Sequence, residues 1–297
     1  MENSLNESAP QYLFGLAVEP DILFSNHKNI FKAGIKKRQS KLAEKIPYLK
    51  RFLKEDEKIV CVTTGCSPMS FLEQWFMGVW IYSIKRCLLV FTNKRVLHIP
   101  TRRNYLYRAS IAQILYADCQ SIMLKGRTLV VKYVNNDKEQ FFHIAGKEKK
   151  KIKAFLKTVL LEGEQSPMQR RTHLCPRCAE ELIENDYTCP GCQFEFKNKV
   201  EAKKISIFYP GGGYFYTGHP VLGALDAITE ISLSSLIVLS LIDAAKGIEG
   251  SIFAAIFVGI ILAIEKAITI YDSNKFINEY IPLNKNIDVE NVILRAD

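Results

Sequence analysis

Four cysteines in two tight pairs constrain this chain more than any other feature. Cys175 and Cys178 form the first Cys-x-x-Cys pair, and Cys189 and Cys192 form the second after ten intervening residues. Tetrahedral zinc takes four thiolates about 2.3 Å from the metal and leaves no position open for water or substrate. A thioredoxin-like redox motif would account for one pair but not for two. The spacing therefore predicts a structural zinc site in a small ribbon, 173–198.

The other four cysteines lack the spacing of a metal site. They lie in mostly uncharged or apolar contexts: Cys61, Cys66, Cys87 and Cys119. Such residues are typical of small buried side chains in a reducing compartment rather than of a disulfide framework. The first ten residues are polar and acidic, without the basic and apolar regions of a signal peptide. We therefore expect the front half of the chain to stay in the cytosol.

Charge is distributed unevenly along the chain. Residues 1–165 carry 28 Lys and Arg against 15 Asp and Glu, a net of +13, whereas residues 166–297 carry 12 against 16, a net of −4. A basic front half suggests an anionic partner, either a membrane surface or nucleic acid. A solvated surface with excess lysine would give the same balance, so charge alone leaves both readings open.

Residues 1–52 are predicted to form a basic helical lead-in. Four apolar residues fall on one stripe at helical spacing: Phe31, Ile35, Leu42 and Ile46. Arg38 interrupts this stripe and Pro47 ends it. A basic amphipathic helix could lie on anionic lipid. Interrupted stripes are common in soluble proteins, so we favour a helix that packs on the next domain with its lysines in water.

Between residues 53 and 163 the pattern changes to short segments rich in β-branched and aromatic residues, several of them separated by turn formers. The segments are 57–64, 84–92, 95–100, 111–124, 128–134 and 140–144. An amphipathic helix is predicted to follow at 147–161. Several antiparallel strands followed by one helix describe a small β-barrel that is plugged at one end.

This region resembles the bacterial PH-like (GRAM-like) domain. The resemblance rests on 53–59 before the first strand, on 88–97 with its Thr92-Asn93-Lys94-Arg95 turn, and on 111–122. It implies a binding or docking scaffold without catalytic residues. Some PH-like domains bind phosphoinositides through a basic first loop, but 61–70 carries no Lys or Arg, so that property is not carried over. The aromatic run 71–82, with Trp75 and Trp80, is too short for a membrane span of about 20 residues and is predicted to be a loop helix.

A polar linker, 164–172, precedes the ribbon, and the region 205–272 is predicted to be a membrane hairpin. Its two apolar segments, 221–243 and 251–271, are each long enough to cross a hydrocarbon core of about 30 Å. Charges interrupt both segments: Asp226 and Glu230 in the first, Glu265 and Lys266 in the second. A charge at the bilayer centre costs about 2.5–3.5 kcal/mol on insertion scales. We expect these residues to meet at one end of the hairpin, and a soluble hairpin buried in an oligomer is the alternative.

The distribution of lysines predicts the orientation of the hairpin. Lys197, Lys199, Lys203 and Lys204 precede the first segment, whereas the connecting loop has one lysine and one acid. The positive-inside rule therefore places the ribbon and both chain ends, including the tail 273–297, in the cytoplasm. The predicted location is the cytoplasmic membrane, with an integral hairpin.

A glycine motif precedes the hairpin. Five residues match the pattern Pro-Gly-x-Gly-x-x-Tyr-x-Gly: Pro210, Gly211, Gly213, Tyr216 and Gly218. The motif resembles the start of small bacterial two-helix membrane domains. Its glycines permit close packing or a sharp turn, and its tyrosines suit the headgroup layer. A phosphate-binding loop is disfavoured because the Gly-Lys-Ser/Thr ending is missing. His219 is expected to be interfacial rather than a ligand.

The predicted fold class is a multidomain α+β protein: a PH-like antiparallel β-barrel with a C-terminal helix, a zinc ribbon and a transmembrane helical hairpin. No nucleophile–base pair or open metal site emerges, so we expect no enzyme and only structural zinc as a cofactor. The first functional hypothesis is a membrane-anchored adaptor or sensor that binds a protein partner or a lipid headgroup.

Two alternatives stay open. The first is an oligomeric transport or channel component that uses the four charges of the hairpin, since charges inside a membrane indicate function by default. The second is a nucleic-acid-binding zinc-ribbon protein. The composition of the ribbon argues against this second alternative, because its acidic side chains make it negatively charged: Glu180, Glu181, Glu184, Asp186 and Glu195.

Overall fold

The structure is a computed structural model, which describes residues 11–283. These residues form two compact units. The first unit comprises 11–184 and 189–194, and the second comprises 185–188 and 195–283. The first ten residues of the lead-in, and the predicted tail from 284 onwards, lie outside the described part of the chain.

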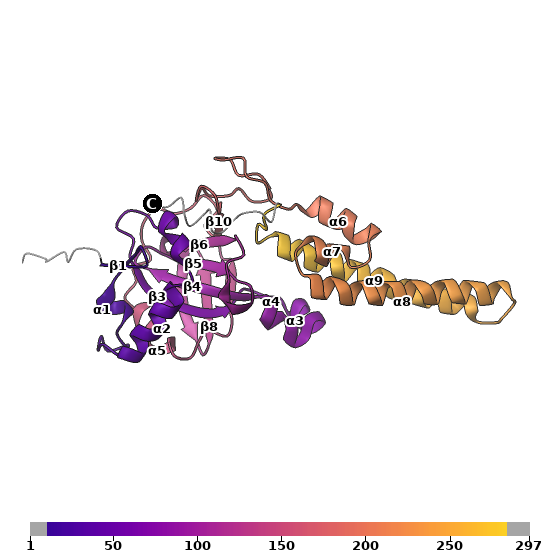
Figure 1. The fold of residues 1–297 in the computed structure, drawn as a ribbon, viewed down its shortest axis with the longest axis horizontal. Coiled ribbons are helices and arrows are strands. Elements are labelled where there is room, and N and C mark those ends of the chain that lie inside the picture. The colour runs from indigo at the N-terminus through magenta and orange to yellow at the C-terminus, as the bar shows by residue number, and fades with distance from the viewer. Residues whose placement is uncertain (1–10, 284–297) are drawn as a thin grey trace, which may run out of the picture. The chain divides into compact units, whose positions relative to one another are not determined.

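The first unit contains two sheets, drawn in Figure 1. The larger has the order β1-β2-β3-β4-β5-β6-β10 and the smaller β7-β8-β9. The strands are β1 (Gln11–Leu13), β2 (Leu16–Val18), β3 (Ile59–Cys66), β4 (Arg86–Thr92), β5 (Arg95–Pro100), β6 (Ile111–Leu115), β7 (Cys119–Lys125), β8 (Thr128–Tyr133), β9 (Lys138–Phe141) and β10 (Thr172–Leu174). Neighbouring strands are antiparallel except β2 and β3, which meet in parallel at Val18 and Ile59.

The described strands form no closed barrel, in contrast to the sequence prediction. The predicted strand 111–124 is broken by the 3-10 helix η4 (Tyr116–Asp118), so the chain leaves one sheet and begins the other there. Asp118 is buried and fixes this turn by accepting hydrogen bonds from the backbone N–H and the hydroxyl of Ser166, at 2.8 and 2.7 Å. The two sheets join at one corner, where Cys66 and Phe142 exchange backbone hydrogen bonds of 2.7 and 3.0 Å.

The core of this unit has two parts that share strand β4. Successive side chains of a strand point to opposite faces. Leu88 and Val90 accordingly belong to one hydrophobic cluster, and Leu89 and Phe91 belong to the other. The first cluster includes residues of α1 (Pro20–Leu23), α2 (Ala33–Ala43) and η1 (Pro47–Phe52), and the second includes residues of the small sheet and of α5 (Lys149–Phe155). β4 is also the middle strand of the large sheet, so it is covered on both faces and flanked on both edges.

The lead-in helix α2 packs on the sheet, as we favoured. Leu42 of the helix and Ile46 just beyond it are buried, whereas Phe31 precedes the helix and is exposed. The amide of Gln39 exchanges two hydrogen bonds, of 2.9 and 2.8 Å, with the backbone of Val62 in β3. Arg38 interrupts the apolar stripe because its guanidinium pairs with Glu148 instead.

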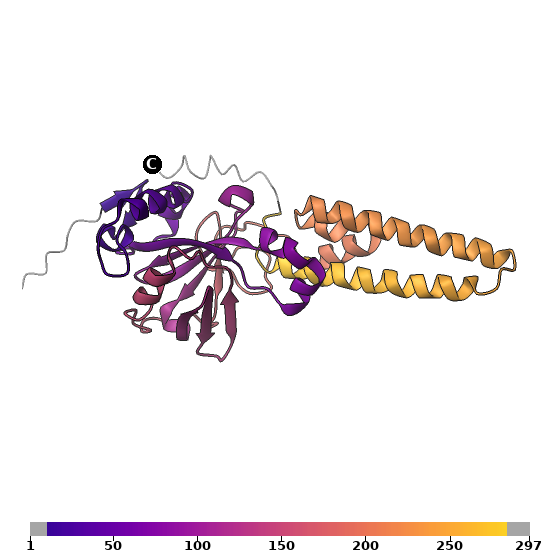
Figure 2. The same ribbon diagram turned by 90° about the horizontal axis from the view of Figure 1, so that it is seen from below.

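The aromatic run is a helical insertion between β3 and β4. It consists of α3 (Phe71–Met77), η2 (Gly78–Trp80) and α4 (Ile81–Ile84), so the predicted loop helix is present. Figures 1 and 2 show this insertion standing out from the end of the sheets. It is therefore a projection of the first unit rather than part of its core.

The second unit is built on two long antiparallel helices, α8 (Pro220–Ala245) and α9 (Ser251–Ile277), which run side by side in Figures 1 and 2. Two shorter helices, α6 (Lys199–Phe208) and α7 (Gly212–Tyr216), pack against them at the end opposite the connecting loop. Helix α9 continues beyond the predicted end of the hairpin at 272. After it, Phe196 and Pro282 form an antiparallel bridge that closes this end.

Candidate functional site

The four ribbon cysteines lie on two turns that repeat the same hydrogen bonds. In the first turn, the N–H of Cys175 donates to Glu180 O at 2.8 Å and the N–H of Ala179 to Cys175 O at 2.9 Å. In the second turn, Cys189 N–H donates to Phe194 O at 2.8 Å and Gln193 N–H to Cys189 O at 3.0 Å. Ala179 and Gln193 both have positive φ, 63° and 55°. The local chain conformation thus presents two thiols from each turn.

The sulfur atoms are close enough together to hold one metal ion. The four Sγ atoms lie within 4.8 Å of one another, with 3.6 Å between Cys175 and Cys192 and 3.5 Å between Cys178 and Cys189. A tetrahedron with metal–sulfur bonds of 2.3 Å has edges of about 3.8 Å. A disulfide would need about 2.05 Å, and all four cysteines are free. The donor set therefore fits a thiophilic metal.

The first cysteine turn is attached to the large sheet. Strand β10, directly before Cys175, pairs with β6, and Leu174 is buried in the first hydrophobic cluster. The guanidinium of Arg51 donates to the carbonyls of Pro176 and Arg177 at 3.0 and 3.1 Å. The ribbon is thus continuous with the sheet at this turn rather than a free-standing domain.

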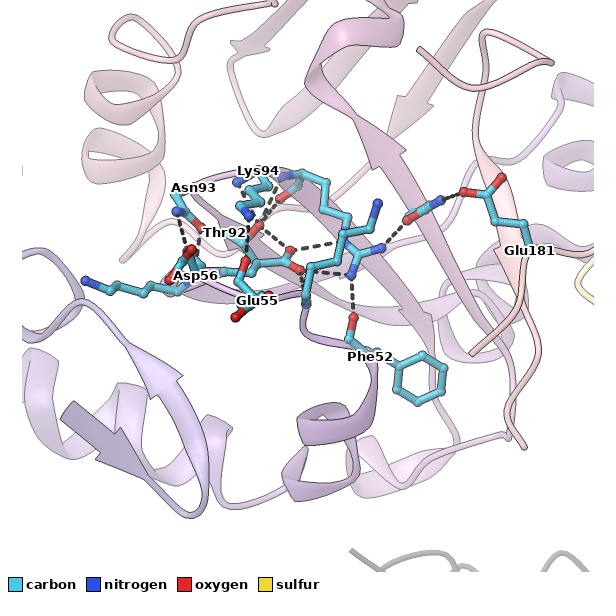
Figure 3. Close-up of polar contacts among 12 residues, drawn as sticks. Phe52, Glu55, Asp56, Thr92, Asn93, Lys94 and Glu181 are labelled. Carbon is cyan, nitrogen blue, oxygen red and sulfur yellow. Dashed lines mark hydrogen bonds and ion pairs between the residues drawn. The ribbon is translucent and has the colours of Figure 1, made fainter. Parts of the chain in front are cut away.

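A buried ion pair connects the segments on which the PH-like resemblance rests (Figure 3). The guanidinium of Arg95 donates to both carboxylate oxygens of Glu57, at 3.0 and 2.9 Å, and both side chains are almost fully buried. Arg95 also donates to the side chain of Gln113 and to Phe52 O. Gln113 in turn donates to Glu181 of the ribbon. The network therefore joins the lead-in, the central hairpin and the ribbon.

The Thr92-Asn93-Lys94-Arg95 turn is held by its own side chains. Thr92 donates to Glu57 at 2.7 Å and accepts from the backbone N–H groups of Lys94 and Arg95 at 3.1 and 3.0 Å. Asn93 donates to Asp56 O at 3.0 Å and accepts from Lys58 N–H at 2.8 Å (Figure 3). The turn and the 53–59 segment are thus locked together, which gives both motifs a structural role.

A groove of about 800 Å³ lies beside this network. Its wall includes Lys54 and Lys94, the end of α5, and the linker around Glu164 and Ser166. Both acidic and basic side chains line the groove, so its electrostatic potential does not favour a ligand of one charge.

A buried serine and histidine meet in the first unit, a pair that sequence reasoning missed. Ser67 Oγ lies 2.8 Å from His98 Nε2, and Arg171 Nη1 lies 3.0 Å from His98 Nδ1. A guanidinium can only donate, so Nδ1 is the acceptor and the proton of a neutral imidazole is on Nε2. His98 then donates to Ser67 and is not placed to remove its proton. This arrangement is therefore a structural hydrogen-bond chain rather than a nucleophile and base.

The predicted charges of the hairpin come together near its α6–α7 end. Carboxylate oxygens of Asp226, Glu230 and Glu265 lie within 4.8 Å of one another. Lys266 Nζ donates to Glu230 Oε2 at 2.6 Å and to Ser206 O at 2.7 Å. The sequence expectation that the two helices would present these groups to one another is met, with Lys266 bonded to Glu230 in particular.

Partners outside the predicted set complete this carboxylate cluster. The hydroxyl of Thr269 lies 3.1 Å from both carboxylate oxygens of Asp226 and 3.3 Å from Glu265 Oε1. One buried oxygen each of Glu230 and Glu265 has no hydrogen-bond partner among the described residues. Three carboxylates against one ammonium leave an excess of negative charge, so protons or a cation must neutralise the cluster in an apolar surrounding.

The glycine motif brings α7 into close contact with its neighbours. A Cβ on Gly213 would lie 2.2 Å from Ser206 Oγ and 2.4 Å from Ser273 Oγ. Gly211 has φ of 65°, and a Cβ there would lie 2.0 Å from Gly223 O. Pro210 and Gly218 flank the helix, and Gly218 also has positive φ. The motif thus supplies both the turn and the close packing expected from its composition.

Two rings next to the motif, those of Tyr214 and His219, differ from the expectation of a headgroup layer, whereas Tyr209 is 64% exposed. Tyr214 is buried, and its hydroxyl donates to Asp272 at 2.8 Å. His219 is also buried and stacks on Phe276 with ring centroids 4.0 Å apart, so it is a core residue rather than an interfacial one. Tyr216 lies beneath the ammonium of Lys197, which is 5.0 Å from the ring centroid. These side chains turn inward because α6 and α7 cover this end of the hairpin.

The rest of the hairpin presents apolar side chains outward. Helices α8 and α9 are long and apolar enough to cross a membrane, and only 6% and 11% of their most apolar windows are buried. Exposed large residues extend along α8 from Val221 to Ile242 and along α9 from Ile252 to Ile264. The core helix of a soluble protein would bury most of such a stretch.

The remaining cysteines are buried and free. Burial raises the pKa of Cys61 and Cys119 to about 12, so both stay protonated and unreactive at neutral pH. Within residues 11–283, the chemically distinctive features are therefore the four-cysteine cluster and the carboxylate cluster. Comparison with known proteins finds no matching family model, no matching curated protein and no matching solved structure.

Proposed function

We propose that this chain is a non-enzymatic adaptor or sensor, anchored in the cytoplasmic membrane by α8 and α9. Its first unit is a PH-like docking domain in the cytoplasm, and its four cysteines hold a structural zinc ion. Cys175, Cys178, Cys189 and Cys192 would be the ligands, and four thiolates would leave the metal without an open catalytic position.

The observation that carries this proposal is the outward-facing apolar surface of the hairpin. Residues 221–242 of α8 extend over about 33 Å at 1.5 Å per residue, which matches a hydrocarbon core of about 30 Å. The carboxylates of Asp226, Glu230 and Glu265 gather instead near the end covered by α6 and α7, and the hydroxyls of Ser232 and Ser235 on the shaft donate to carbonyls of their own helix. An apolar surface along the shaft, with the backbone hydrogen bonds made within each helix, is what a bilayer requires of a helical hairpin.

The strand arrangement supports the PH-like part of the proposal. Within the two sheets, strands β3–β6 and β7–β9 make a four-plus-three antiparallel arrangement, and α5 follows β9. Such scaffolds bind through loops and edges rather than through catalytic side chains, in line with the structural roles of Arg95 and His98.

Fractionation of cells that express the full chain tests the anchor. Membranes are washed first with high salt and then with alkaline carbonate, and the protein is followed by immunoblotting. Retention through both washes is expected, because burial of apolar helices is insensitive to salt and alkali. Release by salt alone would refute membrane spanning and leave a peripheral protein with a basic surface.

A second candidate function follows from the carboxylate cluster. Asp226, Glu230 and Glu265 carry more negative charge than Lys266 compensates, so the hairpin could bind or conduct protons or cations in an oligomer. Replacement of Asp226 by Asn and Glu230 by Gln would abolish ion or proton flux in proteoliposomes if this candidate is correct. The same variant would leave partner recruitment intact if the chain is only an adaptor.

A further inference from the structure

We propose that the aromatic finger, residues 71–84, inserts into the interface of an anionic bilayer and gives the first unit its own contact with the membrane. This inference deepens the proposed function by naming the partner of the docking unit, and it rests on that function for the membrane location. The exposed surface of the finger includes six large side chains whose burial the structure describes: Phe71, Leu72, Trp75, Val79, Trp80 and Tyr82.

The exposure of these residues is unusual for a folded surface. Phe71, Trp75, Val79 and Trp80 are 74%, 72%, 79% and 58% exposed. Contiguous apolar surface of this kind marks an interaction site, because single exposed apolar residues are common but clusters are not. Tryptophan and tyrosine favour the boundary between hydrocarbon and water, where an apolar ring and a polar tip are both accommodated.

The only charged residue within the finger is directed inward. Glu73 is buried and pairs with the buried ammonium of Lys85 at 2.9 Å. Burial alone would raise the pKa of Glu73. The charge of Lys85 and the hydrogen bonds from Ser70 lower it by more, so the pKa lies below its ordinary value and the carboxylate stays ionised and paired. The outer surface therefore carries no charge that would oppose insertion into a bilayer.

The finger is also held in shape before it meets any partner. Ser70 and Glu73 form a reciprocal capping box at the start of α3, with N–H bonds of 3.2 and 2.6 Å. Met77 and Ile81 are buried and anchor the finger on the first unit. A preformed helix loses little conformational entropy on insertion.

Arginines surround the root of the finger. Arg86 begins β4, and its carbonyl accepts from the N–H of Thr101, next to the exposed Arg102. Burial raises the pKa of Cys66 at the root, and Arg86 and Arg127 both lie near enough to lower it in part. The half-buried Arg86 and the exposed Arg102 thus lie at this end of the large sheet, and the exposed Arg127 comes from the turn between β7 and β8 of the small sheet. Cations around an apolar tip complement anionic lipid headgroups, whereas a purely apolar protein partner would not need them.

The sequence offers a direct probe, because the chain has two tryptophans and both are on the finger. The full chain is reconstituted in nanodiscs of phosphatidylglycerol and phosphatidylcholine, with bromine atoms on the phosphatidylcholine acyl chains near the headgroup. Bromine quenches tryptophan only on contact. We expect most of the Trp75 and Trp80 emission to be lost relative to discs without bromine, and acrylamide in the water to quench less than in detergent.

A matched variant separates insertion from mere proximity. Tyr12 lies on β1 and is 68% exposed. Strand β1 pairs with β2, and β2 meets β3 at its start, Ile59. The finger follows the other end of β3. In the variant W75F/W80F/Y12W the reporter is moved away from the finger, and bromine is expected to leave its emission unchanged. Equal quenching at both places would overturn the proposal, because the bilayer would then cover the unit without preference for the finger.

Removal of charge tests the arginine rim. The variant R86Q/R102Q is expected to lose most of the quenching in anionic discs, whereas K41Q/K132Q, which removes two exposed charges elsewhere, is expected to keep it. Unquenched emission from the wild-type chain in discs would overturn the finger contact. A blue shift that depends only on protein concentration would also overturn it, because it would indicate a second copy of the chain as the partner. Failure of the chain to co-elute with discs would instead refute the membrane anchor, so the two proposals fail separately.

Discussion

In the proposed zinc site each ribbon cysteine supplies one of four thiolates, so a single replacement should weaken metal binding. We expect Cys192→Ser to bind zinc at least tenfold more weakly and to lower the melting temperature, because metal binding stabilises the folded ribbon directly. Zinc per chain is measured by atomic emission after dialysis. Cys119→Ala is the matched control, since this buried cysteine lies outside the cluster, and it should keep one zinc per chain. Full zinc content in Cys192→Ser would contradict the assignment of this ligand.

The Glu57–Arg95 pair predicts a large effect of another single substitution. Glu57→Gln leaves the buried guanidinium without its counter-charge and should destabilise the first unit by about 3–5 kcal/mol. Urea unfolding followed by Trp75 and Trp80 emission measures this unit alone, because both tryptophans lie in it. Lys94→Met, an exposed substitution next to Arg95, should change stability by less than about 0.5 kcal/mol. Similar stabilities of the two variants would show that the pair contributes little.

Sequence reasoning found the four cysteines that cluster but not these partnerships. Cys-x-x-Cys spacing is local, so the ligands can be read directly. Glu57 and Arg95 are 38 residues apart, and Ser67 and His98 are 31 apart. Nothing in their local pattern indicates that they meet, because the strand register brings them together. The 53–59 segment and the 92–95 turn are local motifs, so the sequence shows them. The ion pair that links them depends on the strand register, so the sequence does not show it.

At the scale of elements, periodicity predicted most strands of the first unit but not their breaks. The strand expected at 111–124 continues through Tyr116 and Ala117, whose apolar side chains fit a strand as well as they fit the buried turn η4. The three-residue strands β1, β2 and β10 were missed because they are defined by pairing partners rather than by composition. Strand formation at such short lengths depends on the neighbouring strand, which a local pattern does not contain.

In the second unit, the long helices were predicted within a few residues, whereas α6 and α7 were not. Lysines dominate the start of α6 and suggested only a charge run. A signal for this helix was present, since Asn198 caps it by accepting from Glu201 N–H at 2.8 Å, an Asn followed three residues later by Glu. The five residues of α7 are too few to show helical periodicity.

Close packing of α7 predicts the effect of a single methyl group. Gly213→Ala should destabilise the second unit, because its Cβ would overlap the hydroxyls of Ser206 and Ser273. Adding Ser206→Ala and Ser273→Ala should restore part of the loss. Gly259→Ala in α9 is the control, since nothing lies within 4 Å of its Cβ, and a better helix former should be neutral or stabilising by up to about 1 kcal/mol. Thermal unfolding in detergent measures all three, and equal melting temperatures for Gly213→Ala and Gly259→Ala would refute the packing argument.

At the scale of the whole molecule, charge and hydropathy divide the chain into a basic part suited to water and an apolar part suited to a lipid bilayer. The basic first unit exposes a cluster of large apolar residues on the finger, while the second unit exposes apolar residues along two helices and gathers Asp226, Glu230 and Glu265 near the end covered by α6 and α7. A hairpin of this kind brings both of its ends to the same side of a membrane. In the orientation that we propose, the lysines at the open end lie on the cytoplasmic side, as the positive-inside rule favours.

This orientation predicts which residues are accessible from outside an intact cell. Glu249 lies in the exposed loop between α8 and α9, and Leu160 is exposed in the first unit. We expect Glu249→Cys to react with a membrane-impermeant maleimide in intact cells and Leu160→Cys to react only after permeabilisation, with the parent chain as the background for its own cysteines. The reverse pattern would invert the topology. Protection of both positions in intact cells would mean that the loop does not cross the bilayer, because the hairpin would then enter and leave the membrane from the cytoplasmic face.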